Sequence, residues 1–372
     1  MTEIRALWVA RWNITSPEAC SKMVQVMRAN NFNTIIVQVR GRGDAFYKSH
    51  YEPRSEDLAD QSPDFDPLAQ ILDEGHAAGL AVHAWINANL TWGSIKPPIS
   101  PEHIVNKHPD WLMRTQENQI PLGFGKDVEG VYTCPSNEDW REMYKDIYLD
   151  VVRQYDVDGV HFDFIRYPSQ RFCYCDRCLG EFEALRVGAG FEIPPQLREI
   201  PPQLREDRRL AYVRAFPDKW DDYRREQITK MVYKVYDAVK AAKPDVIVSA
   251  SVFQDSSDAY NHRFQDWKKW MADKKLDWLC PMAYTKEPDD WARYIKDAVD
   301  SSGGIPVCGG IGAYRVDSDA CIANIRKGRE LGAAGFSLFS YSITHNGSDD
   351  SYLKALKDEL FPTMEYLGKG VQ

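Results

Sequence analysis

The sequence predicts an α/β fold of the (β/α)8 barrel class, the TIM barrel. Eight short apolar runs can be counted along the chain, and helix-compatible segments alternate with them. Strands that alternate with helices pair in parallel, and eight such strands close a barrel. The length of 372 residues exceeds the roughly 250 typical of these barrels, so long inserted loops are required. We therefore expect one domain, residues 1–372.

The expected strands follow one another along the whole chain. They are Ile4–Trp12, Thr34–Arg40, Leu80–Asn87, Gly159–Arg166, Val246–Phe253, Asp277–Thr285, Ile305–Tyr314 and Gly335–Ser342. The helical patterns between them include Pro17–Asn30, Pro67–Ala78, Glu138–Gln154, Asp289–Asp300 and Ser318–Leu331. Ser16 and Ser136 are placed to cap two of these helices, because a side-chain oxygen there can accept from a free backbone N–H.

Two connections are much longer than the usual loop between a strand and a helix. They span about 89–136, after the third strand, and about 168–209, after the fourth. Barrel active sites are built by loops at this end of the strands, so we expect both insertions to lie over the C-terminal mouth. The second contains a tandem duplication, Ile193–Glu199 then Ile200–Glu206, in which both copies read IPPQLRE. Its Pro-Pro pairs predict a stiff surface loop.

The composition limits the classes of partner. A net charge of −9 disfavours nucleic acid and anionic membranes, because neither would be attracted. No stretch approaches the roughly 20 apolar residues of a membrane span. As numbered, the first strand begins at about Ile4 and leaves no room for a signal peptide, which favours the cytoplasm; a leader removed before Met1 would make the protein secreted or periplasmic. The 11 Trp and 19 Tyr suit stacking on sugar rings or filling a core, so a carbohydrate partner is expected.

Polar side chains occur near the ends of strands whose inner faces are usually apolar. Alternation along a strand gives three polar faces: Gln38 and Arg40 on the second, His83, Trp85 and Asn87 on the third, and His161 and Asp163 on the fourth. The opposite register would place Arg40 and Asp163 against the surrounding helices, where an unpaired charge is costly. We therefore expect all three faces to line one cavity.

Asp163 is the first candidate for a catalytic carboxylate. It can act as a general acid, a nucleophile or a stabiliser of oxocarbenium charge, whereas a structural Asp163 would neutralise Arg40 or Arg166. Glycosidases usually need a second carboxyl group. The last two strands end without an acid, so the candidates come from loops: Asp44, Asp255 and Glu287, of which we favour the first two. An acetamido or amino group on the substrate could also reduce this need.

Other residues at the mouth are candidates for substrate binding. Arg40, Asn87 and Arg166 can hold hydroxyl or carboxylate groups. Trp85, Tyr167, Tyr284 and Tyr341 can stack on sugars or fill the core. Gln38, His83 and His161 complete the expected set. Trp267 and Trp270, three residues apart on one helix face, are expected in the core.

The cysteines suggest a metal site. Cys173, Cys175 and Cys178 form C-x-C-x₂-C in the second insertion, and Cys134 precedes the helix that leads into the fourth strand. Four thiolates suit a tetrahedral zinc ion and leave no open position for water, so the expected zinc is structural; no organic cofactor is expected. One disulfide with spare thiols, or reduced buried cysteines, are the alternatives. Cys20, Cys280, Cys308 and Cys321 are expected to be core residues.

Four phrases together resemble the glycosyl hydrolase-like family 10 barrels. They are QVR at 38–40 with GDAFY at 43–47, HAWIN at 83–87, DGVHFD at 158–163 with RYP at 166–168, and PMAYT at 281–285. The resemblance covers nearly the whole chain. It implies a (β/α)8 fold that acts on polysaccharide or on the glycan strands of peptidoglycan, with Asp163 in the catalytic centre.

The cysteine arrangement resembles that of the family 42 β-galactosidases, in which such cysteines hold structural zinc. This implies a metal at Cys134, Cys173, Cys175 and Cys178. The catalytic glutamates of that group do not carry over, because the fourth strand ends in Asp163 and the seventh offers no Glu.

We therefore expect a glycoside hydrolase that cleaves O-glycosidic bonds of an oligo- or polysaccharide, such as a peptidoglycan glycan strand or an amino sugar polymer. A carbohydrate-binding barrel without catalysis is the alternative, favoured by the lack of an obvious second carboxylate. A lyase or sugar isomerase is a further alternative, disfavoured because no ligand set for an open metal site is visible.

Overall fold

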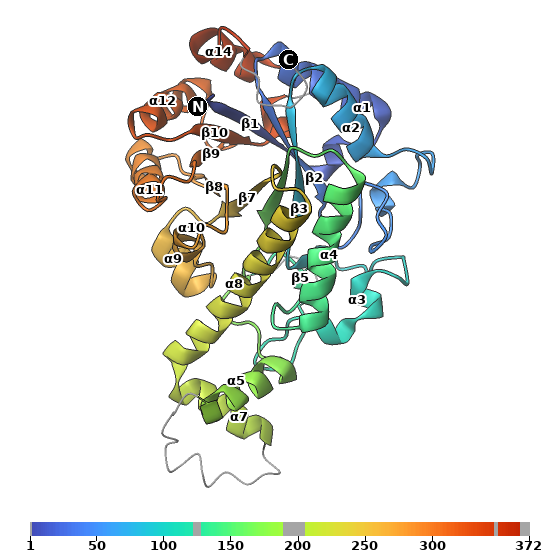
Figure 1. The fold of residues 1–372 in the computed structure, drawn as a ribbon, viewed down its shortest axis with the longest axis vertical. Coiled ribbons are helices and arrows are strands. Elements are labelled where there is room, and N and C mark those ends of the chain that lie inside the picture. The colour runs from blue at the N-terminus through green and yellow to red at the C-terminus, as the bar shows by residue number, and fades with distance from the viewer. Residues whose placement is uncertain (1, 122–127, 189–204, 346–348, 365–372) are drawn as a thin grey trace.

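The computed structural model describes residues 2–121, 128–188, 205–345 and 349–364, and its centre is a parallel eight-stranded sheet (Figure 1). The strands are β1 (Ile4–Val9), β2 (Thr34–Arg40), β3 (Ala81–Asn87), β6 (Gly159–Asp163), β7 (Ile247–Val252), β8 (Trp278–Pro281), β9 (Cys308–Gly312) and β10 (Gly335–Phe339). Their order is β8-β7-β6-β3-β2-β1-β10-β9. A parallel bridge between Leu279 and Val307 joins the two outer strands and closes the ring. The predicted TIM barrel is confirmed.

Several strands are shorter than predicted, and β6 shows why. The predicted strand ran to Arg166, but β6 ends at Asp163 because Phe164 has a φ of 51°, outside the extended region. Arg166 therefore lies in the loop beyond the strand. Asp163 is the last strand residue, directed towards the mouth.

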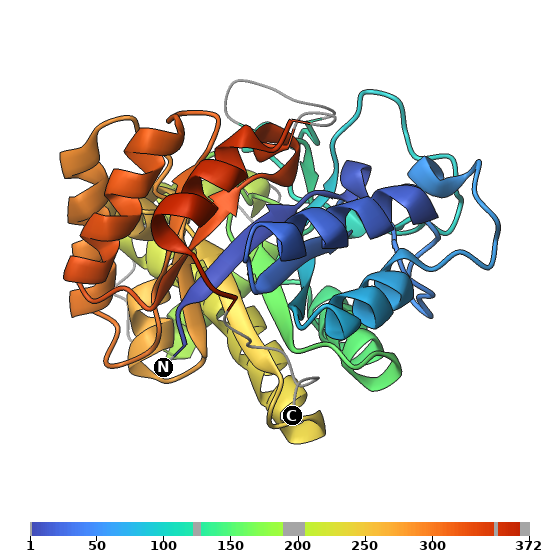
Figure 2. The same ribbon diagram turned by 90° about the horizontal axis from the view of Figure 1, so that it is seen from above.

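Helices surround the barrel. Figure 2, seen from above, shows α1 (Pro17–Ala29) and α2 (Pro67–Ala77), in blue, on one side of the strands. The orange α11 (Pro288–Asp300) and α12 (Ser318–Glu330) lie on the other side. The remaining helices of the outer layer are α4 (Glu138–Gln154), α8 (Pro217–Ala242), α9 (Ser256–His262), α10 (Trp267–Ala272), α13 (Tyr341–Thr344) and α14 (Ser351–Leu360). In the described part of the chain, no helix combines the length and apolarity needed to cross a membrane.

The two predicted helix caps have different outcomes. Ser16 caps α1 as expected, because its Oγ accepts from Ala19 N at 3.2 Å. Ser136 does not cap α4. Asn137 takes that place and accepts from Trp140 N at 3.0 Å, while Ser136 Oγ lies 3.0 Å from the sulfur of Cys134. The helix begins at Glu138, so Asn137 and not Ser136 holds the cap position.

The two insertions differ in position. Within 89–136, β4 (Leu90–Trp92) and β5 (Val131–Tyr132) form an antiparallel pair, joined through α3 (Ile104–Lys107). Within 168–209, α5 (Asp176–Gly188) and α7 (Arg205–Ala215) lie beside the end of α8 that is far from the barrel (Figure 1). Most of the IPPQLRE duplication, 193–204, lies outside the described residues.

The core has two parts. A large cluster fills the space between strands and helices and includes the predicted core residues Trp267 and Trp270, both fully buried. A smaller cluster fills the barrel interior and includes Trp8, Trp85, Cys280 and Cys308. Cys20 and Cys321 are also buried, so all four isolated cysteines are core residues as predicted.

Candidate active site

A cavity of about 290 Å³ lies at the carboxyl ends of the strands. Its aromatic surface comes from Trp8, Trp12, Trp85, Phe164, Tyr284 and Phe339. Its charged groups are Arg11, Arg42, Glu129, Asp163 and Arg166. The first insertion contributes Leu90, Gly93 and Glu129, whereas no described residue of 168–209 lines the cavity. Flat apolar rings beside a few charged groups suit a sugar better than an apolar ligand.

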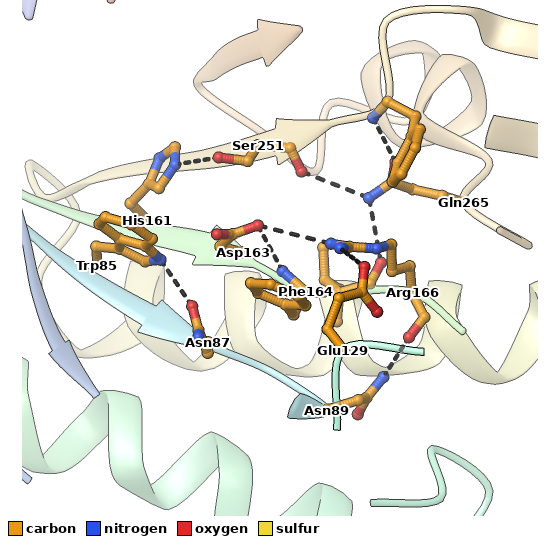
Figure 3. Close-up of polar contacts among 12 residues, drawn as sticks. Trp85, Asn87, Asn89, Glu129, His161, Asp163, Phe164, Arg166, Ser251 and Gln265 are labelled. Atoms are coloured by element: carbon orange, nitrogen blue, oxygen red, sulfur yellow. Dashed lines mark hydrogen bonds and ion pairs between the residues drawn. The ribbon is translucent and has the colours of Figure 1, made fainter. Parts of the chain in front are cut away.

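Asp163 lies in this cavity at the end of β6 (Figure 3). Its Oδ1 accepts from Phe164 N at 2.7 Å and lies 3.7 Å from Nη1 of Arg166. The side chain is 9% exposed. Burial raises the pKa of Asp163 to about 6, although Arg166 and the Phe164 amide act in the opposite direction. This carboxyl group can therefore hold a proton close to neutral pH and donate it to a bound ligand.

Arg166 is fixed beside Asp163 by its surroundings. Its guanidinium lies over the Phe164 ring, 4.1 Å from the centroid, and its backbone oxygen accepts from Asn89 at 3.3 Å. Nη2 donates to Glu129 Oε1 at 3.2 Å. The buried Nε and Nη1 have no hydrogen-bond partner among the described residues. Arg166 as a whole lines the cavity.

Glu129 is the acid of the cavity lining that sequence reasoning missed. It immediately precedes Gly130 and β5, and its Oε2 accepts from the Tyr132 hydroxyl at 2.6 Å. Burial raises the pKa of Glu129, but Arg166 and the Tyr132 hydrogen bond outweigh it, so the pKa is lowered. Glu129 is one of several acids in a long insertion, and no periodicity marks it in the sequence.

Gln38, Trp85 and Asn87 line the cavity as predicted and form one hydrogen-bonded group. Trp85 Nε1 donates to Asn87 Oδ1 at 2.8 Å, and Asn87 Nδ2 donates to Gly41 O at 2.7 Å. Gln38 Nε2 reaches the same Asn87 oxygen at 3.4 Å. The predicted Tyr284 also lines the cavity, with its ring stacked on Phe339 at 5.6 Å. These contacts hold the side chains of this part of the cavity wall in place without a ligand.

Arg40 does not line the cavity, contrary to the expectation. The pairing register of β2 with β3 shifts between Gln38 and Arg40, so the two side chains do not share a face. The Arg40 guanidinium instead makes two 2.7 Å hydrogen bonds to Glu52 and lies over the ring of Trp140 on α4. A charge buried beneath the helices is costly, but the buried Glu52 carboxylate offsets this cost.

His83 and His161 lie below the cavity and do not line it. Trp8 Nε1 donates to His161 Nε2 at 3.3 Å, which places the proton of the neutral ring on Nδ1, 2.8 Å from Ser249 Oγ. Burial lowers the pKa of His161 to about 3 and that of His83 to about 4. His83 stacks on Trp278 at 4.7 Å. Both histidines are neutral parts of the barrel interior.

The other predicted site residues also lie outside the cavity lining. Asp44 accepts from Ser55 Oγ at 2.6 Å, and Asp255 caps α9 through the amides of Ser257 and Asp258. Glu287 is exposed at the start of α11. Of the aromatic candidates, Tyr167 is buried against Phe264 at 5.3 Å and Tyr341 stacks on His345 at 5.2 Å. Asp44, Asp255, Tyr167 and Tyr341 therefore make structural contacts, whereas the Glu287 side chain makes no cap hydrogen bond.

The four clustered cysteines come together as a possible metal centre. The sulfurs of Cys134, Cys173, Cys175 and Cys178 all lie within 4.8 Å of one another, and all four residues are buried. Cys134 lies 3.3 Å from Cys178 and 3.8 Å from Cys175, too far for a disulfide. Zinc bonds of 2.3 Å in a tetrahedron would separate the sulfurs by about 3.8 Å, so this set fits a metal.

A closed parallel barrel with carboxylates in an aromatic cavity at its carboxyl end defines a protein of the glycoside hydrolase type. Residues 3–308 match the sequence profile of the Glycosyl hydrolase-like 10 family, and the chain belongs to this family. It is 25% identical over 422 aligned residues to the glycosyl hydrolase YngK of Bacillus subtilis strain 168, covering 98% of this chain and 74% of YngK.

Two of the many solved structures that share the fold are glycoside hydrolases. The PgaB (BpsB) glycoside hydrolase domain from Bordetella bronchiseptica superposes with a TM-score of 0.69 at 15% identity, over 97% of this chain and 99% of that domain. Gan42B, a GH42 β-galactosidase from G. stearothermophilus, gives a TM-score of 0.61 at 15% identity, over 91% of this chain and 51% of Gan42B. At these identities the likeness is one of fold.

Proposed function

We propose that the chain hydrolyses O-glycosidic bonds of an oligo- or polysaccharide, with Asp163 as the general acid. The observation that carries the proposal is a buried carboxyl group, with a pKa of about 6, in a cavity walled by aromatic rings. The family and the name of the B. subtilis relative support the same activity. A peptidoglycan glycan strand or an amino sugar polymer is the proposed substrate.

Different cavity residues are suited to bind different parts of a sugar. Trp85 and Tyr284 offer ring faces for the apolar side of a sugar. Asn87 and Arg166 line the cavity and offer polar groups that can bind hydroxyl oxygens. Asp163 then gives its proton to the glycosidic oxygen as the bond from that oxygen to the anomeric carbon breaks. The leaving sugar departs as a neutral alcohol.

The test compares the wild type with Asp163→Asn on peptidoglycan glycan strands and on amino sugar oligosaccharides, with new reducing ends as the readout. A general acid contributes about 10²- to 10⁴-fold, so the variant should lose that much kcat/KM while its fold persists. Asp255→Asn is the matched control, because Asp255 caps a helix outside the cavity. Oligosaccharide binding by the wild type without any product would instead identify a binding barrel.

We also propose that the four-cysteine cluster holds a structural zinc ion. The fit of four buried sulfurs to a tetrahedral set supports this. With four protein ligands the ion would have no position for water, so its work would be to join the start of the second insertion, at Cys173, to the segment before α4, at Cys134.

A further inference from the structure

Two carboxylates share one arginine in the cavity. Among the described residues that line it, Asp163 and Glu129 are the only acids. Arg166 contacts Asp163 through Nη1 and Glu129 through Nη2, so its guanidinium lies between them (Figure 3). The sequence favoured Asp44 and Asp255 as the second carboxylate, but neither lines the cavity, whereas Glu129 does.

A close backbone contact between Gly130 and Trp92 places Glu129 in this position. Gly130, the next residue, has a φ of 153°, and a Cβ there would lie 2.0 Å from Trp92 O. Only glycine permits the chain to approach β4 so closely. The Tyr132 hydroxyl, from β5, then holds Oε2 while Arg166 holds Oε1. The Glu129 carboxylate is thus oriented from two directions.

The two acids have different environments. The Asp163 side chain is 9% exposed and the Glu129 side chain is 35% exposed. Burial raises the pKa of Asp163, while Arg166 and Tyr132 overcome the effect of burial and lower that of Glu129. A proton donor and an ionised, partly solvated acceptor therefore coexist over a range of pH.

We propose that Glu129 is the second catalytic carboxylate and acts as the general base that takes a proton from the attacking water. The inference rests on the proposed hydrolase function. The water oxygen bonds to the anomeric carbon as the glycosidic C–O bond breaks; Glu129 gains the water proton and Asp163 gives its own to the leaving oxygen. Proton exchange with solvent restores both groups. Attack by water with Glu129 as its base, in place of direct attack by Glu129, makes the product inverted.

Three other acids make structural contacts outside the cavity lining. Glu52 is tied to Arg40 by two short hydrogen bonds. Asp44 accepts from Ser55, and Asp255 caps α9. None of the three lines the cavity. Glu129 is therefore the acid that can meet a sugar bound against Asp163.

The first experiment measures kcat/KM against pH for Glu129→Gln, which can keep hydrogen bonds to Arg166 and Tyr132. We expect a loss of about 10²-fold or more and the disappearance of the acidic limb of the profile. Glu117→Gln is the control, because Glu117 is an exposed acid of the same insertion, and its profile should not change. Activity within threefold of wild type for Glu129→Gln, while Asp163→Asn is inactive, would overturn this inference and leave the proposed function standing.

The second experiment uses sodium azide with Glu129→Gly. Azide needs no base, so it should restore turnover and give a glycosyl azide of inverted configuration, and NMR should show inverted product from the wild type. Retained product from the wild type, or no rescue by azide, contradicts the base role. A wild type that hydrolyses no glycan at all contradicts the proposed function itself.

Discussion

The Oδ1 atom of Asp163 lies 3.7 Å from Nη1 of Arg166, three residues later in the chain. The contact exists because β6 ends at Asp163 and Phe164 turns the backbone, which brings Arg166 back over its own strand end. Burial raises the pKa of Asp163 and the guanidinium lowers it, with a balance at about 6. Arg166 thus lowers the pH at which the proposed acid loses its proton, against the larger opposite effect of burial.

Replacing Arg166 should move that pH. In Arg166→Gln the cation that favours ionised Asp163 is gone, so the pKa of Asp163 should rise and the alkaline limb of kcat/KM should move above its wild-type position near pH 6. The variant should also lose about 10²-fold in kcat/KM, because a ligand-facing donor is lost. Rates measured between pH 4 and 9 check both effects. An alkaline limb that stays in place or moves down would contradict the proposed role of Arg166.

Asp163 should make stability depend on pH. Its folded pKa of about 6 is above the usual 3.8, so the folded state favours the protonated form. That favourable contribution is complete below about pH 3.8 and is lost as pH rises through about 6. Asp163→Asn removes this pH dependence. Its free energy of unfolding should therefore exceed that of the wild type by up to about 3 kcal/mol at pH 8 and equal it near pH 4.

Urea unfolding of both proteins at pH 4, 5, 7 and 8 measures this difference. Asp255→Asn serves as the comparison, since Asn caps a helix about as well as Asp and this variant should unfold close to the wild type. A difference between Asp163→Asn and wild type that is the same at pH 4 and pH 8 would show that the carboxyl is not perturbed.

The cysteine cluster should bind one zinc ion per chain. Cys178→Ser should bind less metal and unfold at a lower temperature, because one ligand and its link between the insertion and α4 are lost. Cys321→Ser, at a buried cysteine outside the cluster, is the control and should keep its metal. Elemental analysis together with thermal unfolding measures both. Full zinc content in Cys178→Ser, or none in the wild type, would remove the zinc proposal.

Strand periodicity was sufficient to predict much of the cavity wall. Gln38, Trp85, Asn87 and Asp163 follow the alternation of regular strands, and all four line the cavity. The same reasoning failed for Arg40, because a bulge in β2 changes which side its residues face, and a bulge leaves no signature in the pattern of residue types.

Glu129 could not be predicted for a different reason. The insertion that carries it has two short strands, and its path depends on contacts with the barrel that no local pattern records. The cysteines were the opposite case. Three of them are close in sequence at a spacing that suits a metal, so Cys134 was the only distant partner to be found.

Arg40 should matter for stability and not for substrate binding. Arg40→Met leaves Glu52 buried without its partner, which should cost about 3–5 kcal/mol. Adding Glu52→Leu should restore part of this loss, because the uncompensated charge is removed. The KM of both variants, measured where they are folded, should equal that of wild type, since Arg40 lies outside the cavity lining. A raised KM in the folded double variant would indicate that Arg40 does contribute to substrate binding.

Trp12 should contribute binding at the rim of the cavity. It lines the cavity yet is 54% exposed, and Arg11 lies 5.3 Å from its ring centroid. An indole with so much free surface adds little to folding, but it can stack on a sugar unit that extends out of the cavity. Trp12→Ala should therefore raise KM for oligosaccharides about tenfold, equivalent to about 1.4 kcal/mol, with kcat and thermal stability nearly unchanged. Tyr51→Ala, at a 42% exposed aromatic outside the cavity lining, should leave KM as it is. An equal rise of KM in both variants, or a fall in kcat alone for Trp12→Ala, would argue against a sugar contact at this ring.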